Sequence, residues 1–541
     1  MPRLGHARGG FTEGGAAPAR CRVVERAGVC DPDAVTAPTD PNPTDPHPSD
    51  PHPPTAHLVT TSAAALADDL AAGRTTSVEL TRGLLDRIAA VDDAGPELRA
   101  VLAVSSDALD QAAALDAERT DGVVRGPLHG VPVLVKDNIE AVGLPCTAGS
   151  LALAGRVVEH DSPLVASLRS AGLVVLGATN LSEWANMRSP HSASGWSGMG
   201  GLTGNPWALD RSAGGSSSGS GAALAAGLAP LAIGTETDGS ITCPSSLNGV
   251  VGLKPSVGLL PTEGIVPLAA SQDSPGPMAR SVRDVALLLD ALTGSTAYSS
   301  APGTRPLGSL TLGVADGWRS GHDATEALFD SVLARLSDAG ATVGAVVVEP
   351  AGTAGRQELD VLLCELKDGL DRYLAARPGE GVRSLADVIA FDEAHADLEL
   401  AHFGHEFLVQ ADATGGVDDP VYAESRAGCL RWAVEEMLEP AFGGDLAPDL
   451  LIAPAYAPAW KSDLTSGDHF IGGGVASTAP SLAGWPVLCL PIGLAGELPV
   501  GLVLIGRPGS EALLLAAGHA IEEELGLVGT QVPTWTPARR G

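Results

Sequence analysis

Three short segments of the sequence hold the residue types that nucleophilic chemistry needs. They read VLVKDN at 133–138, GGSSSG at 214–219 and TETDGSI at 235–241. A serine hydroxyl is inert near neutral pH unless a base removes its proton. Because Lys136 ends an apolar run that is typical of a buried strand, burial should lower the pKa of its amine and free it to accept that proton. The segments therefore predict a serine nucleophile with a lysine base.

The residues before Ser240 suit a second task. Thr237, Asp238 and Gly239 lie in a turn after an apolar run, and the carboxyl ends of strands are where α/β sites usually form. Successive backbone N–H groups in such a turn can converge on a developing oxyanion. The chain also has only four lysines among its 33 basic residues, which favours a special use for Lys136.

Other interpretations of the serine turns fit less well. Residues 215–219 match the G-x-S-x-G pattern of a nucleophile elbow centred on Ser217. An elbow must follow a buried strand, however, and residues 205–212 look like a loop. A tight structural crossover would explain one turn rich in glycine and serine. Two such turns after a lysine that ends a strand favour a catalytic site.

Histidine and carboxylate chemistry find less support. His129 and His191 are the histidines closest to the serine turns, and neither is near them in sequence. His402 and His405, with Glu406, have the spacing of one helix face, but no third ligand or HExxH order accompanies them. A solvated helix face is therefore expected there rather than zinc. No carboxylate pair indicates glycosidase chemistry.

Composition excludes several classes of protein. The 541 residues carry 65 acidic against 33 basic side chains, and a net charge of −32 repels a phosphate backbone, so we expect no nucleic-acid partner. No apolar run approaches the ~20 residues of a membrane-spanning helix, so no membrane association is expected. The N-terminus lacks the apolar segment of a secretory signal. Seven cysteines without a CxxC pair fit a reducing compartment, and we expect a cytoplasmic protein.

The elements around the three segments alternate between strands and helices. Strand-like runs lie at 131–135, 173–176, 230–234, 310–315, 341–348, 449–454, 486–491 and 500–505. Helical patterns lie at 61–91, 105–119, 163–172, 219–229, 281–293 and 323–339, and across most of 355–445, which holds no recognisable chemistry. This alternation predicts an α/β fold, a large α/β/α sandwich whose mixed, largely parallel central sheet is flanked by helices.

The two ends of the sequence depart from this pattern. Residues 31–56 hold nine prolines in 26 positions and no aromatic residue, so 1–57 is interpreted as a disordered Pro/Asp-rich extension. Translation from a GTG-type start at Val59 would remove that extension. Residues 58–530 are interpreted as one domain, and 531–541 as a C-terminal tail.

The three segments resemble those of the amidase signature family. That family is marked by a lysine in a V-K-D-N context, a G-G-S-S-[GS]-G-S turn and a later [T/D]-x-G-S-[IV] turn. Lys136, Ser216 and Ser240 match these marks and are 80 and 24 residues apart. Further agreement lies in GPLHGVP at 126–132, ATN at 178–180, NGVVGLKP at 248–255 and DSPGP at 273–277. The resemblance covers about residues 58–530.

The resemblance implies one α/β/α domain that hydrolyses or transfers carboxamides through a Ser-cisSer-Lys triad. Ser240 then matches the nucleophile, Ser216 the bridging serine on a cis peptide bond, and Lys136 the neutral base; no metal or cofactor is implied. Asp238 stands where many members have glycine, and Ser218 also replaces a common glycine. With NLSEWAN at 180–186, GWS at 195–197, NPWALD at 205–210 and GDHF at 467–470, these features look like the peptide amidase branch.

Members of that branch remove the C-terminal amide nitrogen from peptide amides, so a peptide or small-molecule amide is the expected substrate. Two other enzymes share the triad: a general aliphatic or aryl amidase, and the amidase subunit of a tRNA-dependent amidotransferase. The net charge and the second turn weigh against the latter. A non-catalytic amide-binding protein would be expected to have lost a triad residue, yet all three are present.

Overall fold

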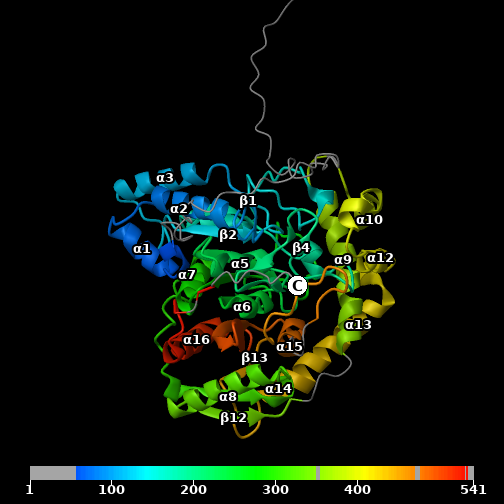
Figure 1. Cartoon of the computed structure of the whole chain (residues 1–541). Helices are drawn as coiled ribbons and strands as arrows, with labels where there is room; N and C mark the ends of the chain where they lie inside the picture. Colours follow the sequence, from blue (N-terminus) through cyan, green and yellow to red (C-terminus); the bar gives the residue numbers. More distant parts are fainter. Residues whose placement is uncertain (1–55, 349–353, 380, 470–474, 531, 534–541) are drawn as a thin grey trace, which may run out of the picture. The chain divides into compact units, whose positions relative to one another are not determined.

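The fold is built on one eleven-stranded sheet, which we describe from a computed structural model (Figure 1). The structure describes residues 56–348, 354–379, 381–469, 475–530 and 532–533. The extension expected at 1–57 and the tail expected at 531–541 lie outside the described residues, except for 56–57 and 532–533.

The sheet mixes parallel and antiparallel strands. Across it, the order is β1 (Val101–Val104), β3 (Val174–Thr179), β2 (Pro132–Lys136), β8 (Leu231–Glu236), β10 (Ser274–Ala279), β9 (Val251–Lys254), β14 (Val487–Ala495), β15 (Leu498–Ile505), β13 (Leu450–Pro454), β11 (Thr311–Ala315) and β12 (Thr342–Val346). Parallel pairs form two blocks, β3–β2–β8 and β13–β11–β12, and the other six of these ten pairs are antiparallel. The predicted mixed sheet is confirmed. Its parallel share is smaller than the sequence suggested, because β1, β9 and β10 gave no strand signal and all pair antiparallel.

Helices surround this sheet (Figure 1). They are α1 (Ala63–Ala71), α2 (Ser77–Val91), α3 (Ala108–Thr120), α4 (Pro163–Ser170), α5 (Ser218–Ala225), α6 (Thr242–Asn248), α7 (Val282–Thr293), α8 (Asp323–Asp338), α9 (Ala354–Ala376), α10 (Leu385–Ala394), α11 (Ala396–Glu399), α12 (Glu406–Asp412), α13 (Pro420–Leu430), α14 (Glu439–Ala441), α15 (Val475–Ala483) and α16 (Glu511–Leu525). A π-helix at Arg431–Leu438 joins α13 to α14. The mostly helical stretch expected at 355–445 is thus confirmed. Within the described chain, no helix is both long and apolar enough to cross a membrane.

Alternation along the strands separates two helical layers, because successive side chains of a strand point to opposite faces. In β14, Leu488 belongs to the hydrophobic cluster that includes Leu514 of α16. The next residue, Cys489, belongs to the cluster that includes Leu247 of α6. Helices α16 and α6 therefore cover opposite faces of the sheet, which is the α/β/α sandwich predicted from the sequence.

The parallel neighbours β2 and β8 bring the chemical segments together. Val135 pairs with Ile233, so Lys136, at the end of β2, lies beside the last residues of β8. Helix α5 begins directly after the GGSS turn and α6 directly after the TDGS turn. The two turns touch, because the Ser217 N–H donates to the Ser240 carbonyl at 3.1 Å.

The loop expected at 205–212 is instead a small hairpin of β6 (Gly204–Asn205) and β7 (Ala208–Ser212). The Asn205 side chain explains the difference. Its amide nitrogen donates to the Ser212 carbonyl at 2.9 Å, and its oxygen accepts from the Trp207 N–H at 2.8 Å. The hairpin is separate from the main sheet, so it does not supply the buried strand that a nucleophile elbow at Ser217 requires.

Helix α5 is seated by a glycine contact that offers a stability test. An added Cβ at Gly219 would lie 2.2 Å from the Ala100 carbonyl oxygen and 2.7 Å from the Asn180 nitrogen. We expect Gly219→Ala to lower the free energy of unfolding by about 1–3 kcal/mol, since the backbone must shift to make room. Gly308→Ala is the control, because its nearest neighbour would be 3.8 Å away. Equal denaturant midpoints for both variants would contradict the close approach.

Candidate active site

Lys136 is fully buried, and among the described residues its amine bonds only to hydroxyl and carbonyl oxygens. Nζ lies 2.8 Å from Ser216 Oγ, 2.8 Å from Thr235 Oγ1 and 3.3 Å from the Thr235 carbonyl oxygen. Asn138 also donates to Thr235 Oγ1, at 3.0 Å. The lysine is therefore enclosed by hydrogen-bond partners that carry no charge.

These partners orient the amine once it is neutral. A neutral lysine has two N–H groups and one lone pair. The Thr235 carbonyl can only accept a hydrogen bond, and the Thr235 hydroxyl oxygen already serves as the acceptor for Asn138. If both lysine N–H groups are directed to Thr235, the lone pair faces Ser216. The geometry thus suits proton transfer from the Ser216 hydroxyl to Lys136.

Burial lowers the pKa of Lys136 to about 7, because desolvation disfavours the ammonium ion. The negative charges of Asp273 and Glu236 oppose this shift but are weaker influences. Asp137, the adjacent residue, accepts a hydrogen bond from the Thr147 N–H at 3.0 Å rather than pairing with the lysine. A lysine that deprotonates near neutral pH can act as a general base.

Ser216 is held in a turn whose shape depends on small residues. The Gly215–Ser216 peptide bond is cis, and Gly214 has a φ of 70°. An added Cβ at Gly215 would lie 2.2 Å from Ser182 Oγ, so only glycine fits without a shift. The Ser182 N–H donates to the Ser216 carbonyl at 3.1 Å. Packing against Ser182 therefore requires glycine at 215, and the positive φ favours glycine at 214.

Ser240 is the most accessible of the three matched residues. Its exposure is 8%, compared with 1% for Ser216 and 0% for Lys136. It lies just before α6, on the turn that contacts the Ser216 turn. This order of burial suits a chain of groups in which Ser240 meets the ligand and Lys136 lies deepest.

The backbone of residues 237–240 offers unused hydrogen-bond donors. None of these four N–H groups donates to another described residue. The next two, of Ile241 and Thr242, are capped by the Glu236 carboxylate at 2.6 and 2.8 Å. Because Glu236 satisfies the start of α6, the N–H groups of 237–240 remain available to a ligand oxygen.

Side chains hold this turn from outside. Thr237 Oγ1 donates to Asp273 at 2.6 Å. Gly239 has a φ of 79°, and an added Cβ would lie 2.4 Å from the Tyr456 hydroxyl oxygen, so glycine is required twice over. The Asp238 carboxylate accepts hydrogen bonds from helix α15. The turn is thus fixed on three sides.

The alternative nucleophile and the nearby histidines serve other purposes. Ser217 Oγ donates to the Thr235 carbonyl at 3.1 Å and accepts from the Thr235 N–H at 3.2 Å, which ties the turn to β8. His129 is buried, with Nε2 2.9 Å from the Leu115 carbonyl oxygen. His191 is exposed. Within the described structure, none of these three side chains bonds to Lys136, Ser216 or Ser240.

The helix face expected for His402 and His405 does not form. Both residues lie in the connection between α11 and α12. His405 Nδ1 lies 3.1 Å from Asp392 Oδ2, and the His402 ring packs edge-on against Trp196, so tertiary contacts override the helical spacing. Within the described residues, no group of three or more His, Cys, Asp or Glu is arranged to hold a metal ion.

A pocket adjoins the group around Lys136. Its lining includes Asn138, Thr235, Thr237 and Asp273, together with apolar side chains from 265–268. Thr235 and Asn138 also bond within the lysine enclosure, so this pocket reaches the residues that orient the amine. It belongs to the candidate active site.

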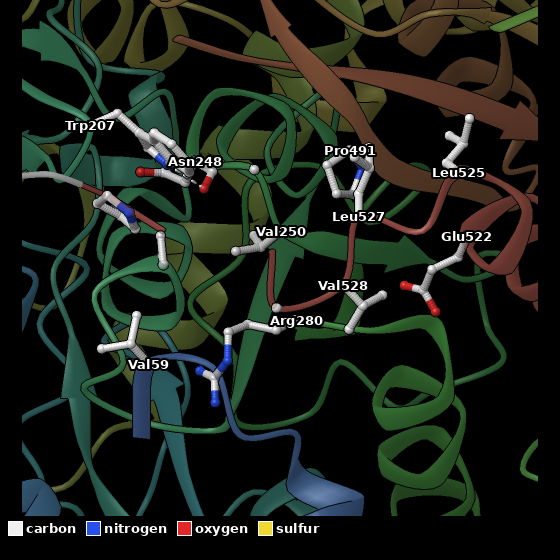
Figure 2. Close-up of a pocket in the computed structure, with 14 residues that line it drawn as sticks. Val59, Trp207, Asn248, Val250, Arg280, Pro491, Glu522, Leu525, Leu527 and Val528 are labelled. Carbon is white, nitrogen blue, oxygen red and sulfur yellow. Dashed lines mark hydrogen bonds between the residues drawn. The ribbon is translucent and has the colours of Figure 1, made fainter. Parts of the chain in front are cut away.

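A second pocket lies elsewhere (Figure 2). Its labelled lining includes Asn248, Arg280, Glu522 and Val528. Asn248 ends α6, whereas Ser240 precedes that helix, so the pocket and the serine lie at opposite ends of α6. The Arg280 guanidinium there donates to four backbone carbonyls and is therefore used in holding the chain together.

The segments that suggested the peptide amidase branch brace the site. Asn180 donates to Thr203 Oγ1 at 3.0 Å and accepts from Ser197 Oγ at 2.7 Å. Asp468 accepts from the Ser194 N–H and hydroxyl at 2.9 and 2.6 Å. These bonds fix the 180–205 stretch, whose Ser182 N–H holds the Ser216 turn.

The chain belongs to the amidase signature family, since the family model described as Amidase matches residues 79–515. The structure is similar to native peptide amidase from Stenotrophomonas maltophilia, with 43% identity and a TM-score of 0.82 over 88% of this chain and 99% of that one. A probable amidase from Arabidopsis thaliana is 36% identical, over 83% of this chain and 87% of its own length. A glutamyl-tRNA(Gln) amidotransferase subunit from Renibacterium salmoninarum is 34% identical, over 86% of this chain and 94% of its own length. The protein is a hydrolase of carboxamide C–N bonds.

Some residues of the site carry no clear signal in the sequence. Thr235 stands in the third segment, but its role depends on β2 and β8 being neighbours. A polar residue at the end of a buried strand is the one hint it offers. Ser477 and Thr478, which bond to Asp238, lie 239 and 240 residues farther along the chain and belong to no recognisable motif.

Thr235 provides a test of the lysine geometry. Thr235→Val keeps the volume but removes the hydroxyl that accepts from Lys136 and Asn138, so we expect kcat to fall about 10–100-fold through misplacement of the amine. The acid limb of the pH–rate profile should move to lower pH, because the ammonium ion loses an acceptor. Thr235→Ser keeps the hydroxyl and should stay near wild type. An unchanged rate and limb in Thr235→Val would contradict this role.

Proposed function

We propose that the protein is a peptide amidase, a serine amidohydrolase that removes the C-terminal amide nitrogen of peptide amides through an acyl-enzyme on Ser240. One observation carries the proposal: a buried lysine amine lies 2.8 Å from the Ser216 hydroxyl, beside the turn that holds Ser240. A catalytic serine needs a base, and this arrangement supplies one without histidine.

The first half of the reaction forms the acyl-enzyme. Neutral Lys136 accepts the proton of the Ser216 hydroxyl, and Ser216 accepts the proton of Ser240. The Ser240 oxygen then bonds to the amide carbon, and the carbonyl oxygen becomes an oxyanion that the N–H groups of Thr237, Asp238, Gly239 and Ser240 stabilise. The protons return along the same path to the amide nitrogen. The C–N bond breaks, and ammonia leaves.

The second half reverses the proton path with water. Water gives a proton through Ser216 to Lys136 and attacks the ester carbon of the acyl-enzyme, since Ser240 is esterified and cannot relay a proton. The bond to Ser240 breaks, the serine regains its proton, and the peptide leaves as a carboxylate. Every proton and electron pair in this scheme is supplied by protein side chains, substrate or water, so the proposal involves no metal or cofactor.

The substrate class rests on the pattern of similarity. The peptide amidase structure shares 43% identity with this chain, whereas the amidotransferase subunit shares 34%. The chain also contains the features of the second turn and of the 180–210 stretch that pointed to peptide amidases from the sequence. A general aliphatic or aryl amidase is the main alternative, and a substrate panel separates the two.

The cysteines and the net charge bear on where the protein acts. The five described cysteines are all buried free thiols, which fits a reducing compartment. We propose a cytoplasmic enzyme that acts on small amides or peptide amides, and its charge of −32 argues against nucleic acid as a partner.

Lys136→Arg tests the base. A guanidinium group stays protonated at any working pH and cannot accept a proton, so Lys136→Arg should be as inactive as Lys136→Ala although it keeps the charge. In the wild type, activity should be low below a pKa of about 7 and rise to a plateau above it, since only the neutral amine is active. Wild-type turnover in Lys136→Arg, measured as ammonia release, would contradict the proton path.

Ser240→Ala tests the nucleophile and the substrate together. Loss of the Ser240 hydroxyl should lower kcat by about 10⁴–10⁶-fold, and intact-mass measurement during turnover should detect no acyl adduct. Ser217→Ala, which removes a structural hydroxyl, should keep a measurable adduct. The panel comprises peptide amides, simple aliphatic amides and aryl anilides. Reaction with only the latter two would refute the peptide amidase assignment while leaving the acyl-enzyme intact.

A further inference from the structure

The Asp238 side chain makes an unusual connection for a residue in a substrate-facing turn. Its two carboxylate oxygens accept hydrogen bonds from consecutive residues of α15, Ser477 Oγ at 2.6 Å and Thr478 Oγ1 at 2.7 Å. Tyr456, which packs against Gly239, lies with its hydroxyl oxygen 3.4 Å from Ser477 Oγ. The turn and the helix are thus joined at two adjacent points.

We propose that Asp238 is a positioning residue, whose carboxylate clamps the 237–240 turn to helix α15 so that the backbone N–H groups converge on the oxyanion. This role rests on the proposed function. It differs from the backbone role given to Asp238 above, because it assigns a task to the side chain. It also gives a reason for aspartate where many family members have glycine.

The clamp acts at the part of the turn that lacks other support. Thr237 is held by Asp273 on one side, and the Cys243 N–H donates to the Gly239 carbonyl at 2.7 Å on the other. The N–H groups of 237–240 make no bond to another described residue. Among the described residues, the peptide units on either side of Asp238 have one other bond, which the Thr237 carbonyl accepts from the Gln272 amide at 3.5 Å, so they would lose most of their support if the Asp238 side chain were released.

The chemistry of the two partners suits a firm clamp. A carboxylate accepting two hydroxyl donors forms charge-assisted hydrogen bonds, which are shorter and stronger than neutral ones. Burial raises the pKa of Asp238 to about 6, and the two hydroxyl bonds work against that shift by favouring the ionised form. Preorganised donors are worth most when they need no rearrangement as the charge develops.

The test compares four variants of the whole protein: Asp238→Ala, Asp238→Asn, the double variant Ser477→Ala/Thr478→Val, and the triple variant that adds Asp238→Ala to it. Removing one oxyanion donor costs about 10²–10³-fold in kcat, so loosening several should lower kcat by 10-fold or more with little change in KM. Asp238→Asn keeps one oxygen acceptor and should lose less. The triple variant should lower kcat little further than Asp238→Ala does, because Asp238→Ala already removes both bonds of the clamp.

A peptide aldehyde separates positioning from simple stability. Ser240 bonds to the aldehyde carbon, its proton passes through Ser216 to Lys136, and the former carbonyl oxygen enters the turn as an oxyanion. The inhibition constant of the aldehyde should therefore weaken by the same factor as kcat. Ser425→Ala is the control, since it removes a similar hydroxyl-to-carboxylate bond, at 3.1 Å to Asp360, between α13 and α9. It should leave kcat and inhibition unchanged.

Three outcomes would overturn the clamp. The first is a wild-type kcat in both Asp238→Ala and the double variant. The second is a loss of kcat in the triple variant that equals the combined losses of Asp238→Ala and the double variant. The third is a lowered melting temperature with no change in kcat or in the inhibition constant. If Asp238→Ala does not fold, the double variant removes both bonds of the clamp and leaves residues 237–240 unchanged. A wild-type protein that releases no ammonia from peptide amides would instead refute the proposed function, so the two failures are distinct.

Discussion

The enclosure of one lysine amine without a counter-ion is the constraint on which the site depends. Carboxylates surround Lys136, and each is engaged elsewhere. Asp137 accepts from Thr147, Asp273 accepts from Thr237, and Glu236 caps the start of α6. Because each of these carboxylates bonds to donors other than Lys136, the lysine amine bonds only to neutral oxygens, and desolvation is the main cause of its lowered pKa. A single free carboxylate beside Nζ would return the lysine to its charged form.

The hydrogen bonds of Glu236 and Asp273 also determine the structure of the 237–240 turn. Glu236 binds the N–H groups of Ile241 and Thr242, whereas the N–H groups of 237–240 have no partner among the described residues. Asp273 both opposes the shift at Lys136 and holds Thr237. The acidic residues near the site therefore act through their hydrogen bonds more than through their charge. Amide hydrolysis needs a neutral base and a set of N–H donors for the oxyanion. These hydrogen bonds allow both to form within a few residues of the end of β8.

The sequence predicts the part of this arrangement that is local. Lys136, Ser216 and Ser240 each lie next to an apolar run, and parallel strands bring their ends to one edge of the sheet. Strand β10 is missed because Pro275 and Pro277 argue against a central strand. They are accommodated there because the β9 ladder reaches only Met278 and Ala279. The partners of Asp238 are missed for another reason. A contact that spans 239 residues depends on tertiary packing, which no local pattern records.

A comparison with the other fully buried lysine separates burial from function. Lys254 also has no exposed surface, and burial lowers its pKa to about 8. Its amine donates to the carbonyl oxygens of Pro255 and Trp485, at 3.2 and 2.8 Å. Carbonyls have no proton to give, so a neutral Lys254 would have nothing to accept and no route by which to act. Lys136 differs because one of its neighbours is a serine hydroxyl. Burial makes a lysine available as a base, and the hydroxyl beside it decides whether that base is used.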